Sequence, residues 1–392
     1  MINTPIDMIQ NSKSSYADGQ VEVEFSRFSP SCGTEEMHAC LRVLPGLHFG
    51  TAWSLLQETA RKLTEESPEG NYDIIWQRFF LSDVPNQLPC LPEKTEDNGA
   101  CSFIGQYPLN GNKIVLWLYA VRTDHTTKDL TREHNATIWK HNGRTHVWSA
   151  NYEHAEGTSE HQTYVLMKQY MEDLHRQQAT LTDNCIRTWF YVRDIDLYYA
   201  GLVKARKDLF ETNGLTPQTH YIASTGIEGK GTDKNVLVHM DAYAVKGLQP
   251  EQISYLHAPT HLNPTHEYGV TFERGTAVIY GDRTHLFISG TASINNRGEI
   301  VHPYHVEEQT LRMWENVEAL LAEKGADGRH IMQAIVYLRD ASDYPAAQDI
   351  IRQKLPDTPT LFVQAPVCRP GWLIEMECIA VLPEGDNTLL PY

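Results

Sequence analysis

Residues 374–381 place apolar side chains at every second position, and this alternation predicts a β-strand because successive side chains of a strand point to opposite faces. The two glutamates of the segment, Glu375 and Glu377, then share the face opposite the apolar one. A Pro-Gly turn precedes the strand, and residues 361–363 predict its partner. Cys368 and Glu375 therefore flank one hairpin, and both are candidates to line a single cleft.

The same strand pattern occurs three times along the chain. Residues 238–245 align with residues 374–381 without a gap, and residues 114–121 align more weakly. Upstream of each copy lies a further apolar strand that ends in aspartate, and an amphipathic helix precedes it in the last two copies. These upstream strands are residues 79–83, 190–194 and 336–340. We therefore predict an α+β fold of three similar units with the order strands, helix, strand, strand, the first unit being degenerate.

The predicted units divide the chain into five parts. These are a leader (1–20), the degenerate unit (21–135), a second unit (136–245), a linker or active-site loop (246–270) and a C-terminal unit (271–392). Residues 246–270 show no clear periodicity and contain three prolines. Such a stretch is either a plain linker or a loop laid across an active site, since long unpatterned segments in compact proteins are often functional.

Composition and charge narrow the class of protein. The chain has 392 residues, of which 41% are hydrophobic and 21% charged, as is ordinary for a globular protein with a sizeable core. Its net charge is −17 and no block of Lys and Arg occurs, which argues against nucleic acid as a partner because phosphates require clustered cations. The seven cysteines form an odd, scattered set without a CxxC motif, which predicts reduced thiols in a cytoplasmic protein.

We also predict no membrane segment, no metal and no cofactor. Residues 1–18 are polar, unlike a signal peptide, and no apolar run approaches the length that spans a bilayer. His257, His261 and His266 invite a metal interpretation, but no carboxylate or cysteine completes a recognised spacing, so we predict loop histidines. The expected partner is a small molecule.

The repeated units resemble the Rid/YjgF family, and two segments of the last unit carry the resemblance. Residues 374–380 match the family's terminal IEIEAIA-type strand, and Ser289-Gly290 match the SG element after its opening hairpin. In that family β-strands pack against two helices and three subunits form a barrel-like trimer. The resemblance therefore implies an intramolecular pseudo-trimer, and hence a monomer or weak homo-oligomer. Thr360 departs from the pattern, because it stands fifteen residues before Glu375, where the family has a carboxylate-binding arginine.

A resemblance to the chorismatases covers most of the chain. The matching segments are residues 102–111, 187–195, 223–227, 272–275, 281–283, 289–294 and 368–370. That family hydrolyses chorismate, releasing pyruvate and leaving a cyclohexadiene diol acid or a hydroxybenzoate. The resemblance implies an active site between the last unit, which is then the catalytic one, and its neighbour, with Glu375 as the acid. The cysteine at Cys368 further implies the branch that yields 3-hydroxybenzoate.

This chemistry requires such residues in its own right. Cleavage of an enol ether needs a proton on the enolpyruvyl methylene carbon, and a positioned carboxylic acid supplies it if it keeps its proton near pH 7. Burial and a like-charged neighbour both raise the pKa of a carboxyl group, and Glu377 is such a neighbour of Glu375. Cys368 is a second candidate to donate or shuttle a proton at the ring.

Chorismate is a dianion, so its site needs cationic or N–H donors at two carboxylates. Arg274 is the best candidate cation, and a turn at Ser224, Thr225 and Gly226 would offer hydroxyl and N–H donors. The remaining candidate binding residues are Tyr268, Ser289 and Gly290. Tyr268 is a candidate either to line the cleft or to cap the edge of the barrel.

Each main candidate also has a purely structural interpretation. Glu375 would be an exposed residue of an edge strand, Cys368 a small buried apolar residue, and Arg274 the partner of a surface acid. The functional interpretation of Glu375 is favoured because the equivalent positions of the other copies hold Val115 and His239, so that one site is singled out.

We therefore predict an enzyme that hydrolyses chorismate or a close enolpyruvyl ether, and the sequence leaves open whether the product is a hydroxybenzoate or the diene diol. One alternative is a Rid-type imine or enamine deaminase, against which Thr360 counts. The other alternative is a non-catalytic regulator that binds a metabolite in the same cleft.

Overall fold

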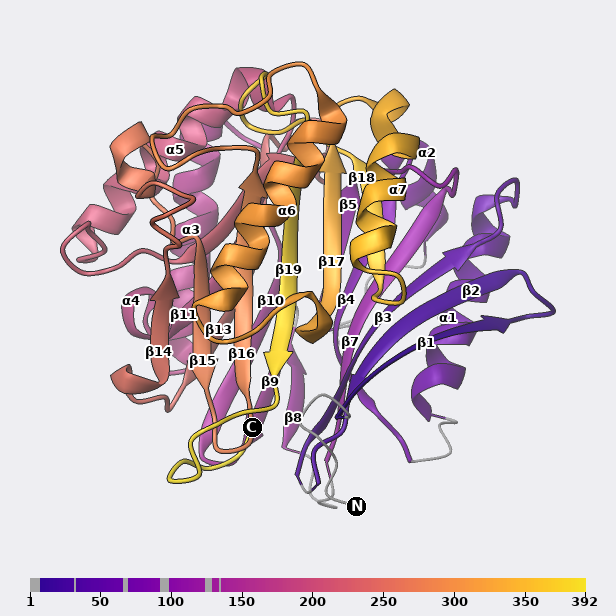
Figure 1. Ribbon diagram of the computed structural model, residues 1–392. Coiled ribbons are helices and arrows are strands. Elements are labelled where there is room, and N and C mark those ends of the chain that lie inside the picture. The colour runs from indigo at the N-terminus through magenta and orange to yellow at the C-terminus, as the bar shows by residue number, and fades with distance from the viewer. Residues whose placement is uncertain (1–7, 32, 66–69, 92–98, 124–128, 134) are drawn as a thin grey trace.

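The computed structural model describes the whole chain except residues 1–7, 32, 66–69, 92–98, 124–128 and 134 and the side chain of Tyr268. The described residues form three β-sheets against which the long helices pack (Figure 1). The predicted α+β class is confirmed.

The described strands form two sheets of six strands and one sheet of seven. The first sheet, in the order β1-β2-β3-β7-β4-β5, consists of β1 (Ile9–Tyr16), β2 (Val21–Phe28), β3 (Glu35–Val43), β4 (Asp73–Leu81), β5 (Ala100–Gly105) and β7 (Ile114–Arg122). The second, in the order β12-β11-β13-β10-β9-β8, consists of β8 (Leu130–Glu133), β9 (Ala136–His141), β10 (Arg144–Glu153), β11 (Cys185–Val192), β12 (Ala223–Glu228) and β13 (Val238–Lys246). The third, in the order β14-β15-β16-β19-β17-β18-β6, consists of β6 (Tyr107–Pro108), β14 (Ile253–Leu256), β15 (Gly275–Ile279), β16 (Thr284–Ala292), β17 (Ile331–Leu338), β18 (Thr360–Gln364) and β19 (Ile374–Leu382).

Each sheet has its own helices. The helices are α1 (Phe49–Glu65) and α2 (Val84–Gln87) in the first part, α3 (Ser159–Arg176), α4 (Leu181–Asn184) and α5 (Ile195–Thr212) in the second, and α6 (Val306–Ala322) and α7 (Tyr344–Lys354) in the third. Short 3-10 turns lie at Leu88–Cys90, Pro250–Gln252, Thr265–Tyr268, Gly328–His330 and Ala341–Asp343. The long helices bury an apolar stripe, as the predicted amphipathic pattern requires: Val317, Leu320 and Leu321 of α6 are fully buried.

The three sheets share one topology. In each, an opening hairpin (β2-β3, β9-β10 or β15-β16) pairs with the last strand of its part (β7, β13 or β19). Beside that strand lies the one that follows the long helix (β4, β11 or β17), whose outer neighbour runs parallel to it (β5, β12 or β18). An additional edge strand (β1, β8 or β14) flanks each hairpin. The threefold repetition expected from the sequence is therefore present in the strand order.

Neighbouring sheets are joined at their edges. Pro108 of β6, which lies in sequence between β5 and β7 of the first sheet, pairs with Val363 of β18 in the third. Isolated bridges join Gly105 to Lys230 and Ile227 to Val367, which link the first sheet to the second and the second to the third. Each sheet therefore contacts both of the others.

The sheets begin and end at other residues than the predicted units. The predicted leader contains β1, the predicted first unit contains β8 of the second sheet, and the predicted linker contains β14. These are edge strands with weak patterns, because β1 is largely polar and β8 and β14 have four residues each. The division of the chain into the five predicted parts stays a prediction.

Aromatic rings and buried ion pairs fill the space between the sheets. The ring of Trp76 on β4 lies 4.7 Å, centroid to centroid, from both Trp148 on β10 and Trp189 on β11. The guanidinium group of Arg78 on β4 donates to the carboxylate of Asp241 on β13, 2.9 Å away. Since a buried charge is costly unless it is paired, these contacts specify how the sheets pack together.

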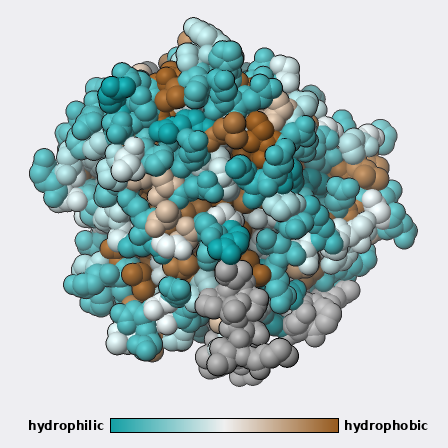
Figure 2. All heavy atoms as spheres, in the orientation of Figure 1, coloured by the Kyte–Doolittle hydropathy of each residue, from teal (hydrophilic) through white to brown (hydrophobic). Residues whose placement is uncertain are grey.

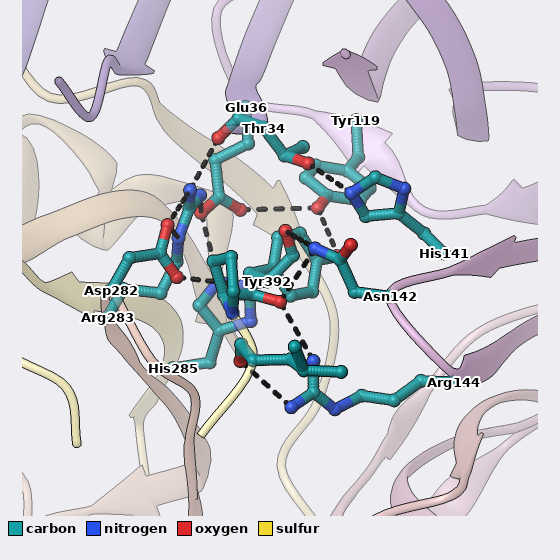
Figure 3. Close-up of polar contacts among 12 residues, drawn as sticks. Thr34, Glu36, Tyr119, His141, Asn142, Arg144, Asp282, Arg283, His285 and Tyr392 are labelled. Carbon is teal, nitrogen blue, oxygen red and sulfur yellow. Dashed lines mark hydrogen bonds and ion pairs between the residues drawn. The ribbon is translucent and has the colours of Figure 1, made fainter. Parts of the chain in front are cut away.

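All three sheets also meet around Tyr392 (Figure 3). Its hydroxyl lies 2.7 Å from that of Tyr119 on β7. Glu36 on β3 pairs with Arg283 beside β16 at 2.6 Å, and Arg144 on β10 donates to the backbone carbonyl that precedes Tyr392. This cluster ties the three sheets together with hydrogen bonds that no single sheet supplies.

The face of the molecule in Figure 2 is largely hydrophilic, with hydrophobic residues in small separate groups. The exposed large hydrophobic side chains are scattered along the described chain: Leu44, Tyr107, Tyr164, Leu197, Tyr304, Leu311 and Leu390. None of the described helices is both long enough and apolar enough to cross a membrane.

Candidate active site

A pocket lies between the second and third sheets. Its walls come from α5 and β12 on one side and from β16, β19 and the segment before β15 on the other. The lining residues are Tyr199, Arg206, Ser224, Gly226, Val270, Phe272, Arg274, Gly290, Ala292, Ile294, Cys368, Arg369, Trp372 and Glu375. The structure thus brings six of the nine candidate site residues into one pocket.

Glu375 reaches this pocket from the middle of the third sheet. It lies on β19 opposite Ala292 of β16 and Tyr337 of β17, and it is 5% exposed, so it is not the exposed edge residue of the structural alternative. Its carboxyl group lies directly over Gly290, where an added Cβ atom would collide with a carboxyl oxygen. The glycine therefore leaves the space that the carboxyl group occupies.

The surroundings of Glu375 favour its protonated form. Burial, and then the negative charge of Glu377, raise the pKa of Glu375 to about 8, although Arg187 and Arg274 oppose the shift. A carboxyl group with this pKa keeps its proton at neutral pH. It is therefore chemically suited to act as a general acid.

Glu377 has a different environment on the same face of β19. Its Oε2 atom accepts a hydrogen bond from Arg187 at 2.9 Å, and its Oε1 atom accepts one from the indole N–H of Trp189 at 2.8 Å. Both donors belong to β11 of the second sheet. With both oxygens accepting hydrogen bonds, one of them charge-assisted, Glu377 is the fixed acceptor of the pair and Glu375 the group that faces the pocket.

Cys368 lines the pocket from the segment between β18 and β19. Burial, followed by the charge of Glu375, raises the pKa of its thiol to about 12, against a hydrogen bond with Tyr199 that lowers it. The thiol is therefore neutral at physiological pH and is not a thiolate nucleophile. It can act as a weak hydrogen-bond donor beside Glu375.

Arg274 is built into the pocket wall and is only 4% exposed, which excludes the surface ion pair of the structural alternative. Its Nη2 atom donates to the backbone carbonyl of Asn263 at 3.0 Å and to the side-chain oxygen of the same residue at 3.2 Å. Asn263 belongs to residues 246–270, and Val270 itself lines the pocket. The segment predicted as a linker or active-site loop thus contributes to the wall of this pocket.

The predicted turn at Ser224, Thr225 and Gly226 is wrong, because these residues lie within β12, which pairs in parallel with β11. The N–H group of Ser224 donates to the Ser289 hydroxyl at 2.9 Å, and the Thr225 hydroxyl accepts from the N–H group of Gly290 at 2.9 Å. Ser224 and Gly226 therefore line the pocket, whereas Thr225 and Ser289 lie behind it and hold β12 against β16.

Several other lining residues are not among the candidates predicted from the sequence. Arg206 on α5 is 1% exposed, and its guanidinium group lies 3.4 Å from the Ser224 hydroxyl and 3.2 Å from that of Thr271. Tyr199, Phe272 and Trp372 supply aromatic surface. Arg206 lies in a helix rich in exposed charges, where nothing but its alignment with a later repeat could have distinguished it.

Other candidates lie elsewhere. The side chain of Tyr268 is outside the part of the chain that the structure describes. Thr360 lies on β18, away from this pocket, and the strand that faces Glu375 holds Ser224 instead. His257 and His266 line a neighbouring cavity next to Arg274. Among the described residues, no group of three or more His, Cys, Asp or Glu side chains is arranged to hold a metal ion.

A family model and two curated relatives each match a part of the chain. The family model of endoribonuclease L-PSP matches residues 275–382, which run from β15 to the end of β19. A RutC family protein of Pyrococcus abyssi is 34% identical over 98 residues, which are 24% of this chain and 76% of that protein. The 3-aminoacrylate deaminase RutC of Acinetobacter baylyi is 26% identical over 97 residues, which are 24% of this chain and 77% of that protein.

The crystal structure of a chorismatase matches most of the chain, covering 81% of it and 96% of the chorismatase with a TM-score of 0.61 and 16% identity. A likeness at this level of identity shows the fold, and it confirms the predicted resemblance to chorismatases with Rid-like units at the level of fold. The relative from Pyrococcus abyssi carries the family assignment, since 76% of its length is matched at 34% identity. The chain belongs to the RutC family.

Proposed function

We propose that this protein hydrolyses the enolpyruvyl ether of chorismate, or of a closely similar dianion, with Glu375 as the general acid. The observation that carries the proposal is the position of Glu375: a buried carboxyl group with its pKa raised to about 8 lines a pocket together with Arg274 and other cationic residues. An acid that keeps its proton beside cations suits an anionic substrate that must be protonated on carbon.

The reaction has two stages. Glu375 transfers its proton to the methylene carbon of the enolpyruvyl group, which becomes a methyl group, and the ether carbon becomes an oxocarbenium centre. Water adds to that centre and returns a proton to Glu375. The resulting hemiketal breaks its bond to the ring oxygen, which leaves pyruvate and the ring alcohol. The Glu375 carboxylate formed in the first stage stabilises the adjacent positive charge.

The pocket wall supports recognition of an anion. The buried Arg274 guanidinium and the Ser224 hydroxyl offer donors to a carboxylate, and Phe272 and Trp372 offer apolar surface to a ring. Cys368 contributes a neutral thiol beside Glu375. From chorismate the ring alcohol formed in this way is the cyclohexadiene diol acid. From the resemblance to chorismatases with a cysteine at the position of Cys368, we further propose that this diol acid then loses water, made up of its second hydroxyl group and a ring hydrogen, so that the final ring product is 3-hydroxybenzoate.

An imine or enamine deaminase is the second candidate, because one relative is a 3-aminoacrylate deaminase. Against it stands Ser224, which occupies on β12 the place that Thr360 occupies on β18, so neither strand presents the arginine of the Rid pattern. Because the Rid pattern places its carboxylate-binding arginine on this strand, the absence of an arginine there leads us to favour the hydrolase.

Two coupled assays on the purified chain separate the candidates. Pyruvate release from chorismate, followed with lactate dehydrogenase and NADH, tests the hydrolase, and chromatography of the same mixture identifies the ring product. Ammonia release from 3-aminoacrylate tests the deaminase. Pyruvate release without ammonia release supports the proposal, and ammonia release without pyruvate release replaces it with the second candidate. The absence of both activities contradicts both candidate functions.

A further inference from the structure

The pocket that contains Glu375 has a structural counterpart between the third and first sheets. On the parallel strands, Thr188 pairs with Ser224 and Ala334 pairs with Thr360. Ser224 on β12 and Thr360 on β18 therefore hold equivalent positions, since β11 and β17 have the same place in their sheets. Thr360 lines a cleft of its own, together with residues of β2, β3 and α7. We call this the third cleft.

Each of the two clefts contains a helical arginine at the same position. Arg206 on α5 and Arg352 on α7 both stand twelve residues after the aligned aspartates Asp194 and Asp340. Arg206 approaches the Ser224 hydroxyl to 3.4 Å, and Arg352 approaches the carbonyl oxygen of Thr360 to 3.4 Å. The two guanidinium groups thus approach equivalent residues of equivalent strands, one at the side chain and the other at the backbone.

In the third cleft this arginine binds a carboxylate that belongs to the chain. Glu24 on β2 lies between Arg352 and Arg42, at 3.0 Å from a guanidinium nitrogen of each. The N–H group of Thr360 lies 3.4 Å from the same carboxylate. Burial opposes the charge of Glu24, but the two arginines outweigh it and lower its pKa. The third cleft is therefore a complete carboxylate site, occupied from within.

The pocket of Glu375 presents the same arginine to a ligand. Among the described lining residues the one carboxylic acid is Glu375, which lies over Gly290 and favours its neutral form. Aromatic surface from Phe272 and Trp372 adjoins the site. We propose that Arg206 binds a carboxylate of the ligand in this pocket, as Arg352 binds Glu24 in the third cleft. This inference rests on the proposed function for the identity of the ligand, but not for the chemistry of its recognition.

Benzoate and benzamide are suitable probes, because they have nearly the same shape and differ in charge. Calorimetric titration of the full chain should show tighter binding of benzoate than of benzamide. In Arg206→Met that preference should fall by about 10- to 100-fold, because a hydrogen-bonded charge partner is lost, while benzamide binding stays within about twofold. Arg206→Lys, which keeps the charge and loses the planar fork, should retain part of the preference.

Arg352→Met is the matched control, since it removes the equivalent arginine from the third cleft. It should lower the stability of the protein and leave the preference for benzoate unchanged. An unchanged preference in Arg206→Met and Arg206→Lys, or no preference in the unmodified protein, overturns the role of Arg206. If the preference depends on Arg206 but chorismate yields no pyruvate, the proposed function fails and this inference stands. If chorismate is hydrolysed but the preference for benzoate does not depend on Arg206, the proposed function stands and the inference about Arg206 fails.

Discussion

Glu375 and Glu377 are two residues apart on one strand face, yet their neighbours give them different roles. Glu377 accepts hydrogen bonds from Arg187 and Trp189, whereas Glu375 faces a pocket in which burial raises its pKa. Two chemically identical carboxyl groups thus differ in role because residues of the second sheet donate hydrogen bonds to one of them and not to the other. The sequence predicted which carboxyl group faces the cleft, but it did not show that β11 holds the other one.

Glu375→Gln should increase the stability of the protein at mildly alkaline pH. The pKa of Glu375 is raised from 4.5 to about 8, so above pH 4.5 the unfolded chain releases a proton that the folded chain retains. Stability is therefore lost as pH rises from 4.5 to 8, and glutamine does not incur that loss. We expect the free energy of unfolding in urea at pH 8 to rise on the order of 2–4 kcal/mol, with little change at pH 4. A variant that is destabilised equally at both pH values would contradict the raised pKa.

Glu377→Gln should move the alkaline limb of the pH–rate profile to lower pH. The negative charge of Glu377 raises the pKa of Glu375, and Arg187 and Arg274 oppose this effect. Without the charge of Glu377 the pKa of Glu375 should therefore be lower than in the unmodified protein. The rate of pyruvate release at pH 6 should fall less than in Glu375→Gln. The measurement is the pH dependence of kcat, and an alkaline limb that stays in place or moves upward would show that Glu377 does not tune the acid.

At the scale of elements, strong periodicity was predictable and edge geometry was not. The strand at residues 374–381 was predictable from its alternating pattern, and so was its repetition as β7, β13 and β19. The pattern is clear in the sequence although both faces of β19 are buried. The strands β1, β8 and β14 are short or polar, so their pairing depends on the neighbouring hairpin. The error at residues 224–226 has a similar cause: a Ser-Thr-Gly sequence is typical of a turn, but the parallel partner β11 holds it as a strand.

Gly290→Ala should impair catalysis without unfolding β16. A Cβ atom at this position collides with the Glu375 carboxyl group, while the backbone of Gly290 has an ordinary conformation. Displacement of the acid should lower kcat by about 10²-fold. Gly50→Ala is the control, because a Cβ atom there meets nothing within 4 Å. Circular dichroism and pyruvate release are the measurements, and full activity of Gly290→Ala would place the reacting acid elsewhere.

Across the whole molecule, the boundaries between three repeats of one topology have diverged in what they contain. One holds Glu375, one is filled by Glu24 with its arginines, and between the first and second sheets Arg78, Asp241 and His239 form a buried ionic network. His239 stands where the third repeat has Glu375. The sequence indicated this divergence through Val115 and His239, but the partners that lie at each boundary come from other repeats and were not predictable.

Arg283→Met should destabilise the fold without affecting the reaction. Arg283 is fully buried and pairs with Glu36 at 2.6 Å in the cluster around Tyr392 (Figure 3). Removal of Arg283 leaves the buried carboxylate of Glu36 without its guanidinium partner, although His285 and Tyr119 remain in contact with it. The free energy of unfolding should therefore fall by about 3–5 kcal/mol. Arg297→Met, which breaks an exposed ion pair with Glu299, should change the free energy of unfolding far less. Urea denaturation decides, and equal effects of the two variants would contradict the structural role of the cluster.

The role of Glu375 as the general acid of chorismate hydrolysis is tested by the rate of pyruvate release at pH 6 and saturating substrate. This rate is compared between the unmodified chain and Glu375→Gln. We expect measurable turnover by the unmodified chain and a decrease of about 10²–10⁴-fold in the variant, because glutamine preserves the shape of the side chain and removes its acidic proton. Turnover that survives Glu375→Gln, or that is absent from the unmodified chain, would contradict this role.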